Sequence, residues 1–134
     1  MNAKELIERY QAGERDFSGV DLSYKNLMSE NLSHLNLSNV DLNNAHLAHA
    51  DLTGTNLTGA NLRHANLYAA QLCNTKFTNA DLSYAHLDVD LEKTNLIGAI
   101  FWRAELRTDL RNVNLNKVNL NGTNLELSNL EGVD

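Results

Sequence analysis

Large apolar residues recur at every fifth position along most of this chain. A leucine or phenylalanine occupies these central positions from Phe17 to Leu87, from Leu91 to Leu106 and from Leu110 to Leu130, with a one-residue shift between the three runs. Two residues before each centre the side chain is mostly Ala, Val or Thr, and the residue directly before the centre is mostly Asp or Asn. A period of five matches neither the repeat of an α-helix nor that of a β-strand. The pattern therefore predicts a solenoid built from short repeats.

Several of these units resemble the A-[DN]-L-x-x signature of the pentapeptide-repeat family, such as ADLTG at 50–54, ANLRH at 60–64 and ADLSY at 80–84. The resemblance covers nearly the whole chain after residue 16. It implies an all-β fold, a right-handed quadrilateral β-helix in which four pentapeptides form one coil and the centres point inward. The twenty-four centres then make about six coils, stacked at about 4.8 Å per coil.

The first fifteen residues lack the five-residue repeat. The segment 4–11 predicts a short α-helix with Leu6, Ile7 and Tyr10 on one stripe. We expect this helix to cap the first coil, because an open solenoid end exposes apolar core and unpaired strand edges. The segment 5–23 also resembles the N-terminal leader of cyanobacterial pentapeptide-repeat proteins. A single domain is predicted, with a helical cap at 1–15, a β-helix at 16–132 and a tail at 133–134.

The composition adds few chemical possibilities. The single cysteine, Cys73, excludes an intramolecular disulfide and a zinc site with several Cys ligands. The N-terminus lacks the apolar stretch of a signal peptide or membrane span, so we expect a cytoplasmic protein without a membrane partner. No Ser-His-Asp arrangement, phosphate-binding Gly-rich loop, Cys pair or HExxH segment occurs. We predict no catalytic residues, no cofactor and no metal, since Leu and Ala fill the narrow interior.

The two shifts in the repeat predict a distinctive corner of the solenoid. The steps 87–91 and 106–110 each lack one residue and lie nineteen residues apart, so the deletions should stack and preserve the alignment of the coils. Residues that occupy the same position in successive coils form a column along the rod. Counting by coils places Asp88 beside Arg107 and Glu92 beside Arg111, with Glu126 and Glu131 next in these two columns. We interpret this corner as a surface of ion pairs, formed by Asp88, Asp90, Glu92, Asp109, Arg107 and Arg111. The alternative is a cation site formed by its four carboxylates, of which Asp90 and Asp109 should be adjacent.

A second departure from the pattern is apolar. Ile97, Ile100 and Trp102 occupy positions where polar residues are the rule, and all three should point outward on adjoining sides. Exposed apolar and aromatic residues together indicate a contact surface, because Trp is over-represented in binding hot spots. The alternative is that Trp102 folds against the coil wall. We take these three residues as the candidate partner surface.

The sequence favours a noncatalytic protein-interaction or scaffold module, with a protein partner that the residues do not identify. The resemblance raises a competing hypothesis, since family members that confer fluoroquinolone resistance mimic B-form DNA and bind DNA gyrase. The net charge of −6 is only a modest excess of acidic over basic residues, and basic residues interrupt the acidic columns, whereas a DNA mimic would need continuous negative charge along the rod. The sequence has no basic patch, so we expect no direct nucleic-acid binding. The last unit, 128–132, is followed by no helix, so a homodimer through the C-terminal coil is a further hypothesis.

Overall fold

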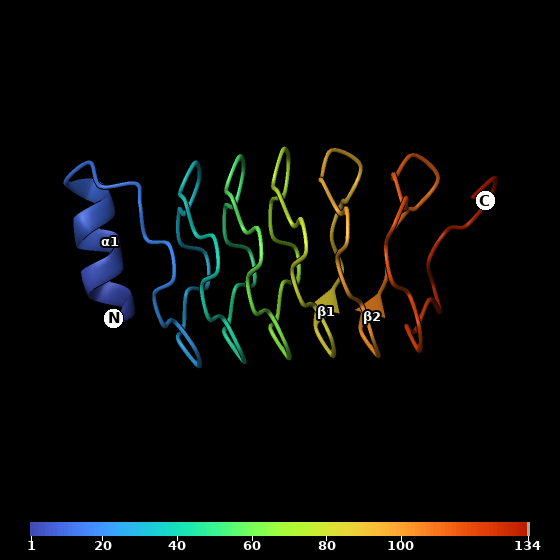
Figure 1. The fold of residues 1–134 in the computed structure, drawn as a ribbon, viewed down its shortest axis with the longest axis horizontal. Coiled ribbons are helices and arrows are strands. Elements are labelled where there is room, and N and C mark those ends of the chain that lie inside the picture. The colour runs from blue at the N-terminus through green and yellow to red at the C-terminus, as the bar shows by residue number, and fades with distance from the viewer. Residues whose placement is uncertain (134) are drawn as a thin grey trace.

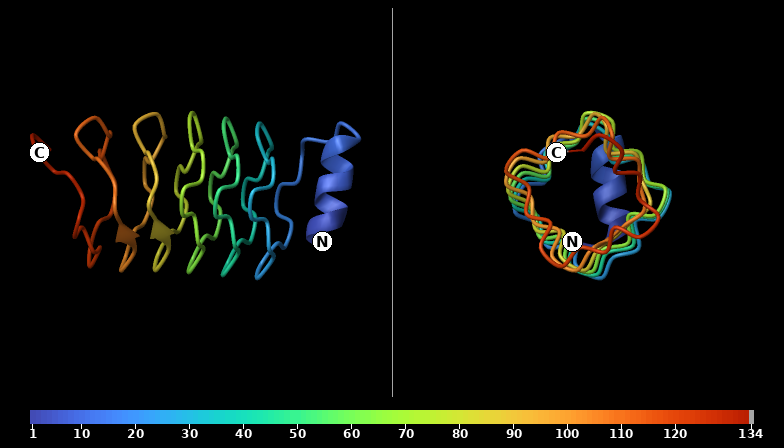
Figure 2. Two further views of the ribbon diagram at one scale, coloured as in Figure 1. Left: turned by 180° about the vertical axis from the view of Figure 1, so that it is seen from behind. Right: turned by 90° about the vertical axis from the view of Figure 1, so that its right-hand side faces the viewer.

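The computed structural model describes residues 1–133 and arranges them as a rod with an α-helix at its N-terminal end (Figure 1). Of the predicted tail, Asp134 lies outside the described residues. Viewed along the rod, the successive coils superpose in one roughly four-sided outline (Figure 2). Among the described residues, no helix has the length and apolar character needed to cross a membrane.

Parallel pairing between neighbouring coils holds the rod together. Asp16 pairs with Asn36 and Asn36 pairs with Asn56, so each coil takes twenty residues, or four pentapeptides. Most of this pairing consists of isolated bridges, because each side has only a residue or two of extended backbone between turns. Regular strands occur at β1, His86–Leu87, and β2, Glu105–Leu106, which pair in parallel. The all-β solenoid predicted from the five-residue period is therefore present with a sparse sheet.

The Asp or Asn before each centre stabilises the turn that follows it. Oδ1 of Asp41 accepts a hydrogen bond from the backbone N–H of Asn43 at 2.9 Å, and other Asp and Asn residues at this position repeat the contact. The second residue has a positive φ in most of these turns, for example 58° at Asn44 and 67° at Gly54. These short polar side chains suit turns because they bond to nearby backbone.

The central residues and the small residues two positions earlier form the predicted core. Phe17, Phe77, Phe101 and every leucine centre up to Leu110 are buried. Where Thr55, Thr75 and Thr123 replace Ala inside the rod, their hydroxyls donate to carbonyls of the neighbouring coil, for example Oγ1 of Thr75 to the carbonyl of Leu52 at 2.9 Å. The interior therefore holds no unpaired polar side chain among the described residues.

Helix α1, Ala3–Gln11, covers the first coil as the sequence predicted. Asn2 caps its N-terminus by accepting a hydrogen bond from the backbone N–H of Glu5 at 2.8 Å. The Leu6 side chain is fully buried, and Ile7 and Tyr10 pack against the core. The helix thus seals the apolar end that the repeat alone would leave open.

The two shortened steps stack, as predicted from their nineteen-residue spacing. Pairing continues on other sides at nineteen-residue intervals, from Asp81 to Ile100 and on to Asn119. The predicted alignment of the coils is therefore preserved, with one gap in the pairing at the shortened corner itself. Gln71 pairs with Asp51, yet within residues 1–133 no bridge joins Asp90 to a neighbouring coil. The interruption is confined to Asp90, because the backbone N–H of Ala69 donates to the carbonyl of Asp88 at 2.9 Å and that of Asn74 donates to the carbonyl of Lys93 at 2.9 Å.

Candidate interaction surface

The three candidate partner residues are exposed and lie along one coil. Ile97 is 44% exposed, Ile100 36% and Trp102 40%. Ile100 sits midway along one side of the coil, while Ile97 and Trp102 lie in the turns at its two ends. In its column Ile100 pairs with Asp81 on one neighbouring coil and Asn119 on the other. An apolar side chain thus replaces the polar ones that stand above and below it.

Trp102 belongs to a ladder of aromatic side chains that sequence analysis did not identify. Its ring centroid lies 5.4 Å from that of Tyr84, with the rings nearly perpendicular. Tyr84 in turn stacks on the His64 ring, with centroids 4.6 Å apart and planes 8° from parallel. These separations are close to the spacing of neighbouring coils. The stack of His64 on Tyr84 could have been predicted from the sequence, since a step of twenty residues, one full coil, leads from His64 to Tyr84.

Two arginines flank the ladder. The guanidinium of Arg63 lies 5.6 Å from the Tyr84 ring centroid and donates a hydrogen bond to Oδ2 of Asp81 at 3.2 Å. The guanidinium of Arg103 lies 5.0 Å from the Trp102 ring centroid. Burial of Asp81 opposes its ionisation, but hydrogen bonds from Ser83 and Arg63 outweigh that effect and lower the pKa of Asp81. The ionised Asp81 offsets the charge of Arg63, whereas Arg103 has no ion-pair partner among residues 1–133, so this corner of an acidic protein carries a net local positive charge.

The neighbouring coil also fixes the position of the indole. A Cβ atom placed on Gly122 would lie 3.3 Å from both Cδ1 and Nε1 of Trp102. The indole therefore sits between Tyr84 on the preceding coil and the Gly122 backbone on the following one. Part of the alternative interpretation is thus correct, since Trp102 contacts the coil wall while it stays exposed.

The charged corner differs from its prediction in how the ions pair. Nε of Arg111 donates hydrogen bonds to both carboxylate oxygens of Asp109, at 2.9 and 3.0 Å. These side-chain bonds, with the backbone N–H of Arg111, lower the pKa of Asp109 to about 2. Asp109 is therefore charged at neutral pH, and it binds Arg111 within its own coil.

The predicted pairs between coils are absent from the described part of the chain: neither Asp88 with Arg107 nor Glu92 with Arg111 forms an ion pair. The coils are paired directly beside Asp88 and Arg107, through Leu87 and Leu106, so neighbouring positions on two coils are not enough to join their side chains in an ion pair. No group of three His, Cys, Asp or Glu side chains among residues 1–133 is placed to hold a metal ion. The cation-site alternative for this corner therefore gains no support.

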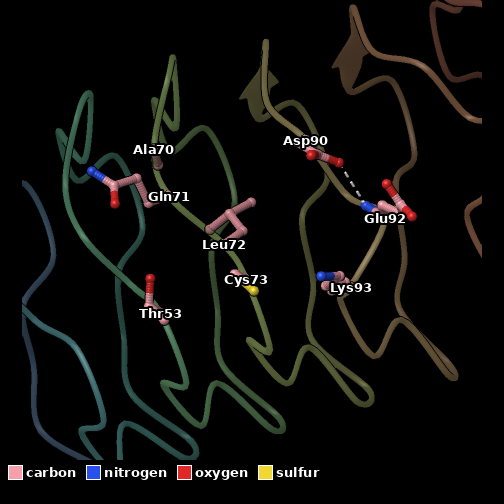
Figure 3. A pocket seen from close by; sticks show the side chains of 8 residues that line it. All are labelled: Thr53, Ala70, Gln71, Leu72, Cys73, Asp90, Glu92 and Lys93. Carbon is pink, nitrogen blue, oxygen red and sulfur yellow. Dashed lines mark hydrogen bonds between the residues drawn. The ribbon is translucent and has the colours of Figure 1, made fainter.

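An open hollow of about 390 Å³ lies where the pairing at Asp90 is missing (Figure 3). Its lining comes from three successive coils, with Thr53 on the first, Gln71 and Leu72 on the second, and Asp90 and Glu92 on the third. Cys73 is exposed at this hollow. The hollow is open to solvent, so it offers no sheltered site for chemistry.

The last coil has a different kind of exposed surface. Its inward-facing Leu115, Leu120 and Leu125 are only partly buried, and Leu130 is 42% exposed. The equivalent leucines of the preceding coils are fully buried. No element among residues 1–133 covers this apolar face (Figure 1).

Comparisons with known proteins agree with the repeat. The family model for pentapeptide repeats matches in eight copies, over residues 16–47, 31–67, 56–88, 77–108 and 88–132. A pentapeptide repeat protein of Nostoc PCC 7120 is 35% identical, with a TM-score of 0.53 and coverage of 88% of this chain and 94% of that chain. One from the Arabidopsis thaliana thylakoid lumen is 31% identical, with a TM-score of 0.44 and coverage of 69% of each chain.

HetL, a Nostoc pentapeptide repeat protein involved in heterocyst differentiation regulation, is 24% identical. Its TM-score is 0.40, and the match covers 98% of this chain and 96% of that chain. A search of curated proteins gave no match. The family model spans the whole solenoid, and the chain therefore belongs to the pentapeptide-repeat family, whose fold is a right-handed β-helix.

Proposed function

We propose that this protein is a noncatalytic interaction module and that its partner is another protein that binds around Trp102. The observation that carries the proposal is the exposure of Ile97, Ile100 and Trp102 together on a wall of otherwise polar residues. Exposed apolar and aromatic clusters mark interaction sites, and Trp is enriched among the residues that dominate binding energy.

The filled interior supports a function on the outer surface. Leucine, phenylalanine and alanine side chains occupy the core of the coils, and the hollows between coils are open to solvent. The indole of Trp102 is held between Tyr84 and Gly122, so this side chain would lose little rotational freedom when a partner binds. A rigid rod that presents a fixed aromatic side chain suits recognition better than catalysis.

Substitution Trp102→Ala tests this proposal. We expect the variant to lose the proteins that the wild type captures from its native extract, with affinity reduced by about thirtyfold or more, as for a hot-spot residue. Partners would be identified by mass spectrometry, and circular dichroism would check the fold. Tyr24→Ala is the matched control, because Tyr24 is 70% exposed in an equivalent turn remote from Trp102. Equal capture by wild type and Trp102→Ala would rule the proposal out.

Self-association through the last coil is a second proposal, supported by the partly exposed Leu115, Leu120, Leu125 and Leu130. Two copies that meet at this face would bury the apolar surface of both. Sedimentation equilibrium should give a dimer for the chain and a monomer for a version that lacks residues 126–134. A monomer in both samples would contradict a homodimer.

The gyrase hypothesis has no specific observation in its favour. Arg63 and Arg103 interrupt the acidic surface, whereas a DNA mimic needs continuous negative charge along the rod. A cytoplasmic location also stays a prediction, and the lumenal origin of the Arabidopsis relative is a property of that protein.

A further inference from the structure

The corner around Trp102 combines aromatic rings with arginines, and this combination indicates the chemistry of its partner. We call it the aromatic–arginine corner, formed by Arg63, His64, Tyr84, Trp102 and Arg103. We propose that this corner binds an extended protein segment that carries carboxylate side chains next to an aliphatic one. The inference rests on the proposed function and specifies the class of partner.

The rings of the ladder are already engaged with one another. The Tyr84 ring is bounded by the parallel His64 ring and by the edge-on indole of Trp102. The indole is bounded by Tyr84 and by the Gly122 backbone, with the Arg103 guanidinium also close to it. Nucleic-acid bases bind aromatic side chains by stacking on free ring faces. This ladder is a packed support for the arginines and a poor platform for base stacking.

The arginines provide the charge that selects an acidic partner. Arg63 already contacts Asp81, whereas Arg103 forms no ion pair with a carboxylate among residues 1–133. A guanidinium that lies over an aromatic ring keeps its N–H groups available, and their planar arrangement matches a carboxylate. The net charge of −6 would repel the closely spaced phosphates of a nucleic acid. A peptide with one or two carboxylates meets the local positive charge with far less repulsion.

The apolar part of the surface fits the aliphatic side chain of the same segment. Ile100 and Ile97 lie on the coil that carries Trp102 and Arg103, so an apolar contact and a charged contact are available side by side. Arg63 and Arg103 are separated by two coil steps, or about 10 Å along the rod. An extended peptide covers that distance in about three residues. Carboxylates with this separation would reach both arginines.

Selection from a random peptide library displayed on phage tests the proposal. The immobilised full-length protein is the target, and Trp102→Ala is the counter-target. We expect enriched peptides with Asp or Glu near Leu, Ile or Val. Their binding would be followed by the fluorescence of Trp102, the single tryptophan of the chain. Arg103→Glu should weaken binding by about tenfold or more, because a charged hydrogen bond is replaced by repulsion.

A charge exchange makes the test specific. Peptides in which Lys replaces the acidic residue should bind Arg103→Glu better than they bind the wild type. Arg107→Glu is the control, since Arg107 lies at the shortened corner, and it should leave binding unchanged. Enrichment of neutral apolar peptides that still require Trp102 would overturn the carboxylate inference and leave the proposed function standing. Absence of enrichment, or tighter binding of an oligothymidylate than of any peptide, would also overturn the inference.

Discussion

Substitution Phe101→Ala should lower the free energy of unfolding by about 3–5 kcal/mol, the usual loss for a buried phenylalanine, and should abolish partner binding. The Phe101 side chain is fully buried and directly beneath the coil side that carries Ile100 and Trp102. Its removal leaves a cavity, and a rod this narrow has few other side chains that could fill it. Ile100 and Trp102 would both lose the fixed positions on which recognition depends. Urea denaturation gives the stability, and the selected peptides or captured partners give the binding.

Phe17→Ala separates the local effect from the global one. Phe17 is also buried, but it belongs to the first coil, where its ring lies 5.2 Å from the Arg9 guanidinium of the cap, several coils before the one that carries Trp102. A similar loss of stability with binding retained is expected, because contacts in a repeat protein extend mainly to neighbouring repeats. If Phe17→Ala also loses binding under conditions where it stays folded, or if Phe101→Ala binds normally, the coil beneath Trp102 has no special role.

The five-residue period was enough to predict which side chains face the core and which face solvent. Leu52 and Ala60 are buried, and Ile100 and Trp102 are exposed, as their places in the repeat required. The cap was predictable for a similar reason, since the apolar stripe that includes Leu6 has the period of a helix and lies just before an exposed solenoid end. In the solenoid and in the cap, the position of a residue in the period decides whether its side chain is buried, and burial of apolar side chains dominates the free energy of folding.

The contacts between coils were harder to predict. Column counting places Arg111 beside Glu92, but the side chain instead bonds to Asp109 two residues away. A period gives the neighbours of a residue, whereas the rotamer of a long side chain decides which neighbour it contacts. The missing pairing at Asp90 has a related cause, because the path of a shortened corner depends on its backbone dihedrals. Counting by coils reaches the stacked pair of His64 and Tyr84, but it places Tyr84 beside Arg103, so the contact of Tyr84 with Trp102 depends on the direction that the indole takes.

Substitution Leu6→Asp should detach the helical cap and cause the rods to associate through their N-terminal ends. The Leu6 side chain is completely buried between α1 and the first coil. A carboxylate there would be desolvated without a partner, so a loss of at least about 3 kcal/mol in the free energy of unfolding is expected. The released helix would expose Phe17, Leu22 and the unpaired backbone of the first coil. Sedimentation velocity should then show species larger than those of the wild type.

The control for the cap is Lys4→Asp, which changes charge on the solvent side of the same helix. The Lys4 side chain is 85% exposed, and its contact with Glu8 at 3.7 Å is a surface ion pair of small value. This variant should keep the stability and association state of the wild type. An unchanged association state for Leu6→Asp, together with loss of helical circular dichroism, would mean that the first coil is stable without its helix. In that case the edge of the first coil would itself have to resist pairing, and it carries charged residues, Arg15 and Lys25, at positions where later coils mostly carry Thr or Ala.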